Sequence, residues 1–254
     1  MDLKDQSLLY RQPHLYELLY PVPDKETYVA PSICNSIFDK FLAEPPRSVL
    51  DVGCGTGRQV HFLSETCPDC VGIDYLPEMV AFAKSQYPHI EFIQGDMRGF
   101  RVNRTFDALI CMGSTFMHAL TNSDIRQTLD TFAAHSHDGS LLILDIKNSI
   151  SFVTKEAPGT VEKEIETEAF TARYVMNRSF DLEKQLWIWK RTWMLPDQDP
   201  VEDLLEFRML FPRELASYLA GAGYEILGMF DNPDLVKSDL TGNRLYVVAM
   251  YKDR

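Results

Sequence analysis

The sequence has no long apolar run and comparatively few positive charges. None of its hydrophobic stretches approaches the roughly 20 residues that a membrane-spanning helix needs, and the polar, acidic start from Met1 to Gln6 does not resemble a secretory signal. The 254 residues include 25 Lys and Arg against 37 Asp and Glu, a formal net charge of −12. The missing span and signal predict a cytoplasmic protein. Because binding along a phosphate backbone needs a basic face, the acidic balance predicts that it binds neither nucleic acid nor membrane. A neutral or cationic small molecule suits this charge better.

Cysteine is also scarce. The five cysteines are an odd number without the spacing of a disulfide framework, so we expect reduced thiols. Cys67 and Cys70 form a single C-x-x-C motif with no second pair nearby. A surface turn before a strand is therefore favoured over a zinc or redox site. A chain of this length also buries enough surface to fold without disulfides or a structural metal.

Strands and helices alternate in the middle of the sequence. The apparent strands are short β-rich runs at 48–52, 71–74, 90–93, 106–112 and 140–146. Helical patterns lie between them, most clearly at 123–135, and others precede them at 8–20 and 26–43. Buried parallel strands are continuously apolar, as residues 108–111 are. The alternation is typical of a doubly wound α/β sheet.

The alternation stops at about residue 148. The following segments are predicted to be strands at 170–180, 186–195 and 204–210, a helix at 212–221, and strands at 224–230 and 244–251. Trp187 and Trp189 share one face of a half-buried antiparallel strand that could also cover a substrate. We expect one domain, residues 1–254, with four parts: a helical cap (1–46), a cofactor-binding core (47–147), a β-rich insertion (148–211) and a C-terminal helix with the last two strands (212–254).

A glycine-rich loop and two acidic residues follow the first three strands of the core. Gly53, Gly55 and Gly57 succeed the first strand, where open α/β sheets bind ligands. Their spacing is not the G-x-G-x-x-G expected for a dinucleotide, and no P-loop lysine follows. Asp74, which ends the second strand, is placed to accept hydrogen bonds from ribose hydroxyls. Asp96 follows the third, where a carboxylate can accept from an exocyclic amino group and Met97 can border an adenine ring.

These residues resemble the motifs of class I S-adenosylmethionine (SAM)-dependent methyltransferases. The similar stretches are LDVGCGTG (50–57), GIDYLPEMVAFAK (72–84), IEFIQGDMRGF (90–100) and FDALICM (106–112). The resemblance implies a Rossmann-like α/β fold with a seven-stranded, mostly parallel sheet of order 3-2-1-4-5-7-6 and a β-rich antiparallel insertion after strand 5. It implies SAM as the cofactor and a cofactor site made of Tyr28, Asp51, Gly53, Gly55, Gly57, Asp74, Tyr75, Asp96, Met97 and Met112. In this arrangement the glycines border the methionine part, and Asp51 lies near its amino-acid end.

His118 is the best-placed candidate base for the acceptor. It follows the fourth strand, and an unperturbed imidazole pKa near ~6.5 suits proton acceptance at neutral pH. The stretch from Ser114 to His118, with Tyr16 on the N-terminal helix, is similar to a narrower group, the aminosugar N,N-dimethyltransferases of macrolide biosynthesis. This similarity implies a small amine acceptor, with His118 and Tyr16 as catalytic residues. Further candidates for substrate contact are Ser114, Phe116, Arg173, Trp187, Trp189 and Asn232.

Several alternatives stay open at this point. The same fold and base could methylate a phenol or alcohol oxygen, or the chain could be a non-catalytic cofactor-binding partner. A nicotinamide-dependent oxidoreductase is disfavoured by the glycine spacing. No metal is expected, because Cys111 and Met112 stand where a catechol-type magnesium site needs a carboxylate, and Asp145 alone cannot build that site. We expect a monomer or homodimer acting on a small-molecule substrate.

Overall fold

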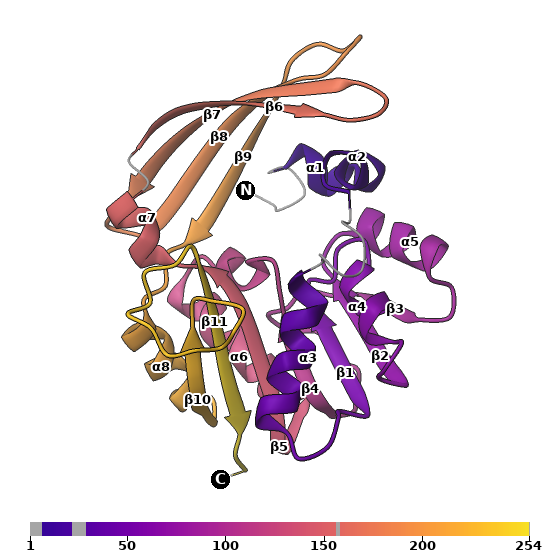
Figure 1. Ribbon diagram of the computed structural model, residues 1–254, viewed down its shortest axis with the longest axis vertical. Helices are drawn as coiled ribbons and strands as arrows, with labels where there is room; N and C mark the ends of the chain where they lie inside the picture. Colours follow the sequence, from indigo (N-terminus) through magenta and orange to yellow (C-terminus); the bar gives the residue numbers. More distant parts are fainter. Residues whose placement is uncertain (1–6, 22–28, 156–157, 254) are drawn as a thin grey trace.

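The computed structural model describes residues 7–21, 29–155 and 158–253. Tyr28, which the sequence assigns to the cofactor site, lies outside these residues. Two sheets dominate the structure, a larger one flanked by helices and a smaller one that arches over it (Figure 1).

The larger sheet has seven strands in the order β10-β11-β5-β4-β1-β2-β3. These strands are β1 (Ser48–Val52), β2 (Asp69–Asp74), β3 (Glu91–Gln94), β4 (Phe106–Cys111), β5 (Ser136–Lys147), β10 (Tyr224–Phe230) and β11 (Arg244–Tyr251). β1 to β5 pair in parallel, whereas β11 is antiparallel to both β5 and β10. With β10 and β11 as its sixth and seventh strands, the sheet confirms the expected order 3-2-1-4-5-7-6.

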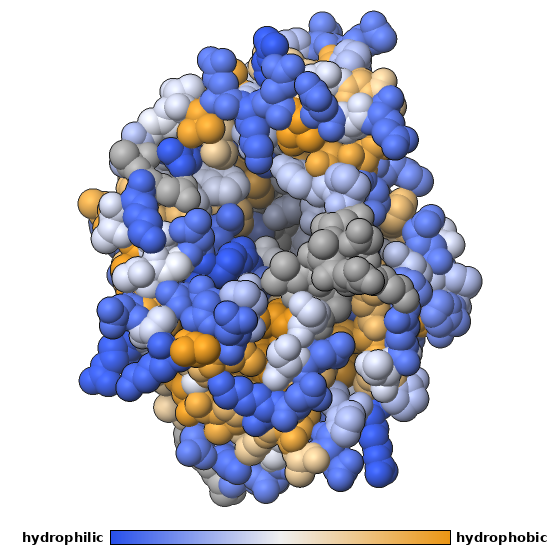
Figure 2. All heavy atoms as spheres, in the orientation of Figure 1, coloured by the Kyte–Doolittle hydropathy of each residue, from blue (hydrophilic) through white to orange (hydrophobic). Residues whose placement is uncertain are grey.

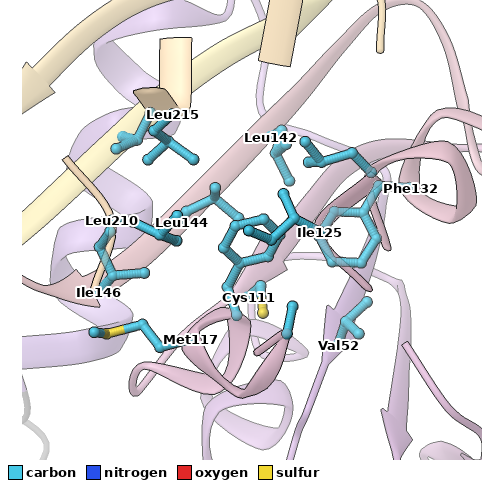
Figure 3. Close-up of a cluster of buried hydrophobic side chains, with 14 of the residues drawn as sticks. Val52, Cys111, Met117, Ile125, Phe132, Leu142, Leu144, Ile146, Leu210 and Leu215 are labelled. Carbon is cyan, nitrogen blue, oxygen red and sulfur yellow. The ribbon is translucent and has the colours of Figure 1, made fainter. Parts of the chain in front are cut away.

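Helices cover both faces of this sheet because successive strand residues point to opposite sides. One face packs against α3 (Val29–Phe41), α4 (Arg58–Leu63) and α5 (Pro77–Gln86). The other packs against α6 (Asn122–Ala133) and α8 (Pro212–Gly221). Figure 3 shows part of this second core, where Ile125 and Phe132 of α6 lie against Leu142 and Leu144 of β5.

The smaller sheet is wholly antiparallel, in the order β6-β7-β8-β9. Its strands are β6 (Gly159–Glu166), β7 (Thr171–Asp181), β8 (Leu186–Met194) and β9 (Val201–Arg208), and α7 (Ser149–Lys155) leads into it from β5. The sequence prediction included β7 to β9 but omitted β6. That strand is an edge strand whose residues are mostly exposed and polar, so it lacks the apolar run that identified the others.

Two short N-terminal helices lie between the smaller sheet and α5 (Figure 1). They are α1 (Leu8–Arg11) and α2 (Pro13–Leu19), where the sequence predicted one helix over 8–20. Pro13 occupies the first turn of α2, and Gln12 before it has a non-helical conformation (φ −129°). Because a proline disfavours helical geometry in the residue before it, the chain forms two helices at this position.

All five cysteines are free and buried. The C-x-x-C motif contains the expected surface bend before a strand, at exposed Pro68, but both of its thiols are buried. Cys67 follows α4, Cys70 lies within β2, and both belong to the core beneath α3 and α4. None of the helices in the described part of the chain is long and apolar enough to cross a membrane. On the face shown in Figure 2, hydrophilic side chains dominate over the smaller sheet, and apolar patches are more prominent in the lower half.

Candidate active site

A cavity of about 450 Å³ opens at the carboxyl ends of the parallel strands. Its walls come from the segments that follow β1, β2, β3 and β4, from Asp145 of β5, and from Tyr10 and Tyr16 of the N-terminal helices. Parallel strands expose their ends at one edge of the sheet, so loops distant in sequence converge there. The N-terminal helices close the cavity from the side of the smaller sheet.

The glycine loop presents bare backbone to this cavity. Gly53 (φ +79°) and Gly55 (φ +56°) adopt left-handed conformations that favour glycine. A Cβ on Gly53 would lie 2.2 Å from Cγ2 of Thr115, whereas one on Gly55 would meet nothing within 4 Å. Gly55 lines the cavity, so its missing side chain leaves room for a ligand. The backbone amide of Gly53 donates to the carbonyl of Ile73 (2.7 Å), which ties the loop to β2.

Gly57 packs tightly at the start of α4. It does not line the cavity but precedes α4 with φ +85°, and a Cβ there would lie 2.8 Å from the ring of Phe92. Its lack of a side chain therefore serves close packing between α4 and the sheet, and the prediction that it borders the methionine part of the cofactor is not supported by its position.

Two buried carboxylates stand at the ends of β1 and β2. Oδ1 of Asp51 has no hydrogen-bond partner in the described residues, and burial together with the nearby Asp74 raises the pKa of Asp51 to about 8. Asp74 accepts from the amides of Gly55 (2.8 Å) and Leu76 (2.9 Å). Burial still raises the pKa of Asp74 above its ordinary value. An unpartnered buried oxygen carries a desolvation cost that a cationic or donor ligand would relieve.

Asp96, after β3, is already paired. Arg98 contacts its carboxylate through Nε (3.0 Å to Oδ1) and Nη2 (2.6 Å to Oδ2), and reaches Asp124 of α6 through Nη1 (3.1 Å). Burial acts in the opposite direction, but the hydrogen bonds from Arg98 lower the pKa of Asp96. Arg98 and Asp124, which the sequence did not identify, also line the cavity.

His118 and Tyr10 meet at the wall of the cavity nearest the smaller sheet. His118 ends the short 3₁₀ helix η2 (Thr115–His118), and its Nε2 lies 3.3 Å from the hydroxyl of Tyr10. Burial lowers the pKa of His118 to about 4, so the imidazole is neutral at pH 7. The expectation of a near-ordinary histidine pKa is therefore wrong, because packing against Tyr10 and Phe207 desolvates the ring. Burial likewise raises the pKa of the Tyr10 hydroxyl.

The loop that carries His118 is held by an ion pair between β5 and β11. Nε of Arg244 donates to Oδ1 of Asp145 (2.7 Å), and Oδ2 of Asp145 accepts from the amide of Gly113 (3.0 Å). Arg244 also donates to the hydroxyl of Ser114 (3.1 Å). Asp145 thus lines the cavity and fixes the start of the loop after β4.

Tyr16 lines the cavity, but among the described residues it forms no hydrogen bond or ring contact with His118. Its ring lies 5.0 Å from the guanidinium carbon of Arg58, which pairs with Glu17 (3.3 Å) and donates to the carbonyl of Tyr20 (2.6 Å). The described residues expected at the site that do line the cavity are Tyr16, Asp51, Gly53, Gly55, Asp74, Tyr75, Asp96, Met97, Met112 and His118. Tyr10 was missed because nothing in the sequence separates it from Tyr16 in the same helical stretch.

The six residues suggested for substrate contact lie outside this cavity: Ser114, Phe116, Arg173, Trp187, Trp189 and Asn232. Phe116 is fully buried in the core, and the hydroxyl of Ser114 accepts from Arg244. Arg173 is exposed and pairs with Glu164 of the neighbouring strand (3.0 Å).

Trp187 and Trp189 lie on an antiparallel strand with aromatic packing, as expected, and neither lines the cavity. Trp187 is buried, with its ring centroid 3.7 Å from that of Phe152, and the ammonium group of Lys147 lies 4.8 Å from the Trp189 ring. These rings therefore contact the core and a lysine of the chain itself. Asn232 donates to the carbonyl of Val236 within a surface loop (2.9 Å).

Comparison with known proteins agrees with this architecture. Residues 49–139 match the family model described as "Methyltransferase domain". The chain is 29% identical over 133 residues to a dTDP-3-amino-3,4,6-trideoxy-alpha-D-glucopyranose N,N-dimethyltransferase from Streptomyces venezuelae, a match that covers 52% of this chain and 55% of the relative. It is 32% identical over 98 residues to a dTDP-3-amino-3,6-dideoxy-alpha-D-glucopyranose N,N-dimethyltransferase from Streptomyces fradiae, covering 39% of this chain and 38% of the relative.

Similarity to solved structures extends over nearly the whole chain, whereas the curated relatives are matched over about half their length or less. A SAM-bound amino pentose methyltransferase from Micromonospora echinaspora superposes with a TM-score of 0.75 at 24% identity, covering 93% of this chain and 96% of that one. A sugar N-methyltransferase from a Streptoalloteichus species gives 0.76 at 21% identity, covering 94% and 93%. The resemblance recognised in the motifs is confirmed: residues 49–139 match the methyltransferase domain model, and the chain has the fold of SAM-dependent methyltransferases.

Proposed function

We propose that this protein transfers the methyl group of SAM to a nitrogen atom of a small amine, with an aminosugar as the leading acceptor. One observation carries the proposal: a single cavity joins the cofactor-type residues Asp51, Gly55 and Asp74 to the Tyr10–His118 pair. The N-methyltransferases among the relatives favour nitrogen, and two of them act on amino-deoxy sugars by name.

The residues at the strand ends fit SAM. The open backbone at Gly55 and the unpartnered oxygen of Asp51 suit the positively charged methionine part. Each carboxylate oxygen of Asp74 accepts one backbone amide and has a further lone pair for a ribose hydroxyl. Asp96 and Met97 would border the adenine, with Arg98 sharing the Asp96 carboxylate. When bound, SAM supplies a methyl group on a sulfonium centre, which an unprotonated nucleophile can attack.

Tyr10 and His118 would then orient the acceptor amine. With its proton directed at Nε2 of His118, the Tyr10 hydroxyl oxygen is available to accept an N–H of the acceptor. Because the pKa of His118 is about 4, the imidazole accepts a hydrogen bond and relays a proton but does not retain one at neutral pH. Methyl transfer is a displacement between aligned groups, so orientation of the amine by this pair would account for much of the catalysis.

Calorimetry with SAM, S-adenosylhomocysteine and NAD tests the cofactor assignment. We expect both sulfur ligands to bind and NAD not to bind, and binding of NAD alone would contradict the proposal. Turnover with amino-deoxy sugars and with simple aromatic amines, followed by mass spectrometry and NMR of the product, then locates the transferred methyl group. Methylation of oxygen in place of nitrogen is the alternative outcome, because the same base and fold also suit a phenol.

A further inference from the structure

A buried ion pair lies on the inner face of the smaller sheet. Arg191 of β8 and Asp203 of β9 are directly opposite each other in the strand register. Nε of Arg191 donates to Oδ1 of Asp203 (2.7 Å) and Nη2 to Oδ2 (2.6 Å). The side chains are 6% and 0% exposed. The indole Nε1 of Trp193 adds a third hydrogen bond to Oδ2 (3.1 Å).

This pair also binds the start of the first helix. Oδ2 of Asp203 accepts from the backbone amide of Leu8 (3.0 Å), and Nη2 of Arg191 donates to the hydroxyl of Ser7 (3.1 Å). The side chain of Ser7 makes no capping bond to its own helix, so these contacts from β8 and β9 replace a local cap. Both bonds involve a charged partner and are therefore stronger than a neutral pair.

The geometry links this anchor to the candidate active site. Leu8 begins α1, and Tyr10 lies two residues further on, with its hydroxyl 3.3 Å from His118. Helix α1 has only four residues and contacts both β9 and α5, so its position depends on these neighbours. Figure 1 shows α1 beneath the arch of the smaller sheet, next to α5.

Stability alone is a weak reason for such a pair. Burying two charges has a desolvation cost that their attraction roughly offsets, and apolar replacements of similar volume are often equally stable. The apolar contacts of Leu8 and Leu9 with Trp193 and Tyr174 already hold the helix near the sheet. The ion pair in addition fixes the orientation of the start of α1, because its hydrogen bonds hold the amide of Leu8 and the hydroxyl of Ser7 at defined points.

We propose that Arg191 and Asp203 are positioning residues: they fix the start of α1 against β8 and β9 and so place the Tyr10 hydroxyl against His118. The inference rests on the proposed function for its catalytic consequence, but not for the docking itself. Neither side chain lines the cavity, so both act through Leu8, Ser7 and Tyr10.

Two variants and a matched control test this proposal. Asp203→Asn removes the charge of the carboxylate but keeps its shape. If this change prevents folding, the double variant Arg191→Met with Asp203→Leu removes both charges and retains apolar packing. Glu164→Gln is the control, because it breaks the exposed pair with Arg173 on the same sheet. Hydrogen exchange of the amides of residues 8–11 measures the docking, and steady-state kinetics with calorimetric SAM binding measures its effect.

In the two network variants we expect faster exchange at residues 8–11 and a fall in kcat of about tenfold or more, with the Kd for SAM within about threefold of the unmodified protein. Combining Asp203→Asn with Tyr10→Phe should lower kcat no further than the larger single effect, because both changes remove the same interaction. Glu164→Gln should leave exchange and kcat unchanged.

Folded network variants with unchanged exchange at residues 8–11 would overturn the proposal, and so would unchanged kcat in an active enzyme. A merely structural role predicts a general loss of stability with additive kinetics in the double variant, which also contradicts it. If the unmodified protein neither binds SAM nor methylates an amine, the proposed function fails while the exchange measurement still decides the docking.

Discussion

The Tyr10 hydroxyl and Nε2 of His118 lie 3.3 Å apart although 108 residues separate them. Their rings meet edge-on, with centroids 5.8 Å apart. One residue comes from the N-terminal helix and the other from the loop after β4, so this contact exists only when the N-terminal helices are seated on the cavity.

Replacing Tyr10 should impair turnover more than replacing Tyr16. Tyr10→Phe removes the only side-chain hydrogen-bonding group recorded at Nε2 of His118 among the described residues, and we expect kcat to fall about 10- to 100-fold with little change in the Kd for SAM. Tyr16→Phe keeps the ring beside Arg58 and should reduce kcat less than about threefold. Stopped-assay kinetics with both variants decides between the two tyrosines. Equal losses would assign Tyr16 an equivalent role.

Binding of SAM should release a proton from Asp51. Its pKa of about 8 leaves the carboxyl mostly protonated at pH 7 in the ligand-free protein, and a cationic ligand favours the ionised form. We therefore expect close to one proton, about 0.9, to be released per SAM at pH 7. Calorimetry in phosphate and in Tris measures this number from the dependence of enthalpy on buffer. Asp51→Asn should bind more weakly and show no buffer dependence, and proton release that persists in this variant would refute the assignment.

Acid should destabilise the protein partly through His118. Its pKa is about 4 when folded and near 6.5 when unfolded, so the unfolded state binds the proton more tightly. The contribution of His118 to the free energy of unfolding is fully present above pH 6.5. It is lost as pH falls towards 4, by up to about 3 kcal/mol. Urea unfolding of the parent and of His118→Gln at pH 7 and pH 5 should show a smaller acid loss in the variant.

His137 provides a control of opposite sign. The carbonyl of Asp138 and the carboxylate of Asp107 raise its pKa, so it stabilises the folded state at low pH. His137→Gln should therefore make the protein more sensitive to acid. The same direction of change in both histidine variants would contradict the argument for His118.

A side chain at Gly55 should block the cofactor without unfolding the protein. Gly55→Ala imposes a left-handed alanine, a cost of about 1 kcal/mol, but its Cβ meets no protein atom and projects from a residue that lines the cavity. We expect at least a tenfold weaker Kd for SAM, measured by calorimetry. Gly139→Ala, at φ +89° with equal free space and away from the cavity, should show a similar loss of stability and unchanged binding. Equal binding by both variants would remove Gly55 from the cofactor site.

The parallel strands of the larger sheet could be predicted because the signals that identify them lie within short stretches of sequence. Continuous apolar runs such as residues 108–111 marked the buried strands, and the glycines and Asp74 marked the edge at which they end. β6 was not predictable in the same way, since an exposed edge strand needs no apolar pattern. The start of α6 at Asn122 also reflects a local signal, because Thr121 and Asp124 form a capping box.

The acceptor side was less predictable because it depends on contacts between distant segments. The sequence could suggest a tyrosine on an N-terminal helix, but the contact of Tyr10 with His118, 108 residues away, and the bond from Leu8 to Asp203, 195 residues away, are visible only in the fold. The sequence suggested Trp187 and Trp189 as substrate contacts and did not distinguish the surroundings of the three tryptophans. Two of them, Trp187 and Trp193, are instead fully buried in two different cores, which only the pairing of β7, β8 and β9 determines.

The anchoring of Leu8 on Asp203 has a consequence for building chimeric enzymes. The N-terminal helices and the smaller sheet come before and after the first five strands in the chain, which makes exchange of either one between relatives attractive. Residues 7–20 and 159–208 nevertheless share one set of hydrogen bonds, so transplanting one segment alone places the Leu8 amide and Ser7 hydroxyl of one parent against the Arg191–Asp203 pair of the other. A chimera that keeps the position of the first helix therefore takes both segments from the same parent.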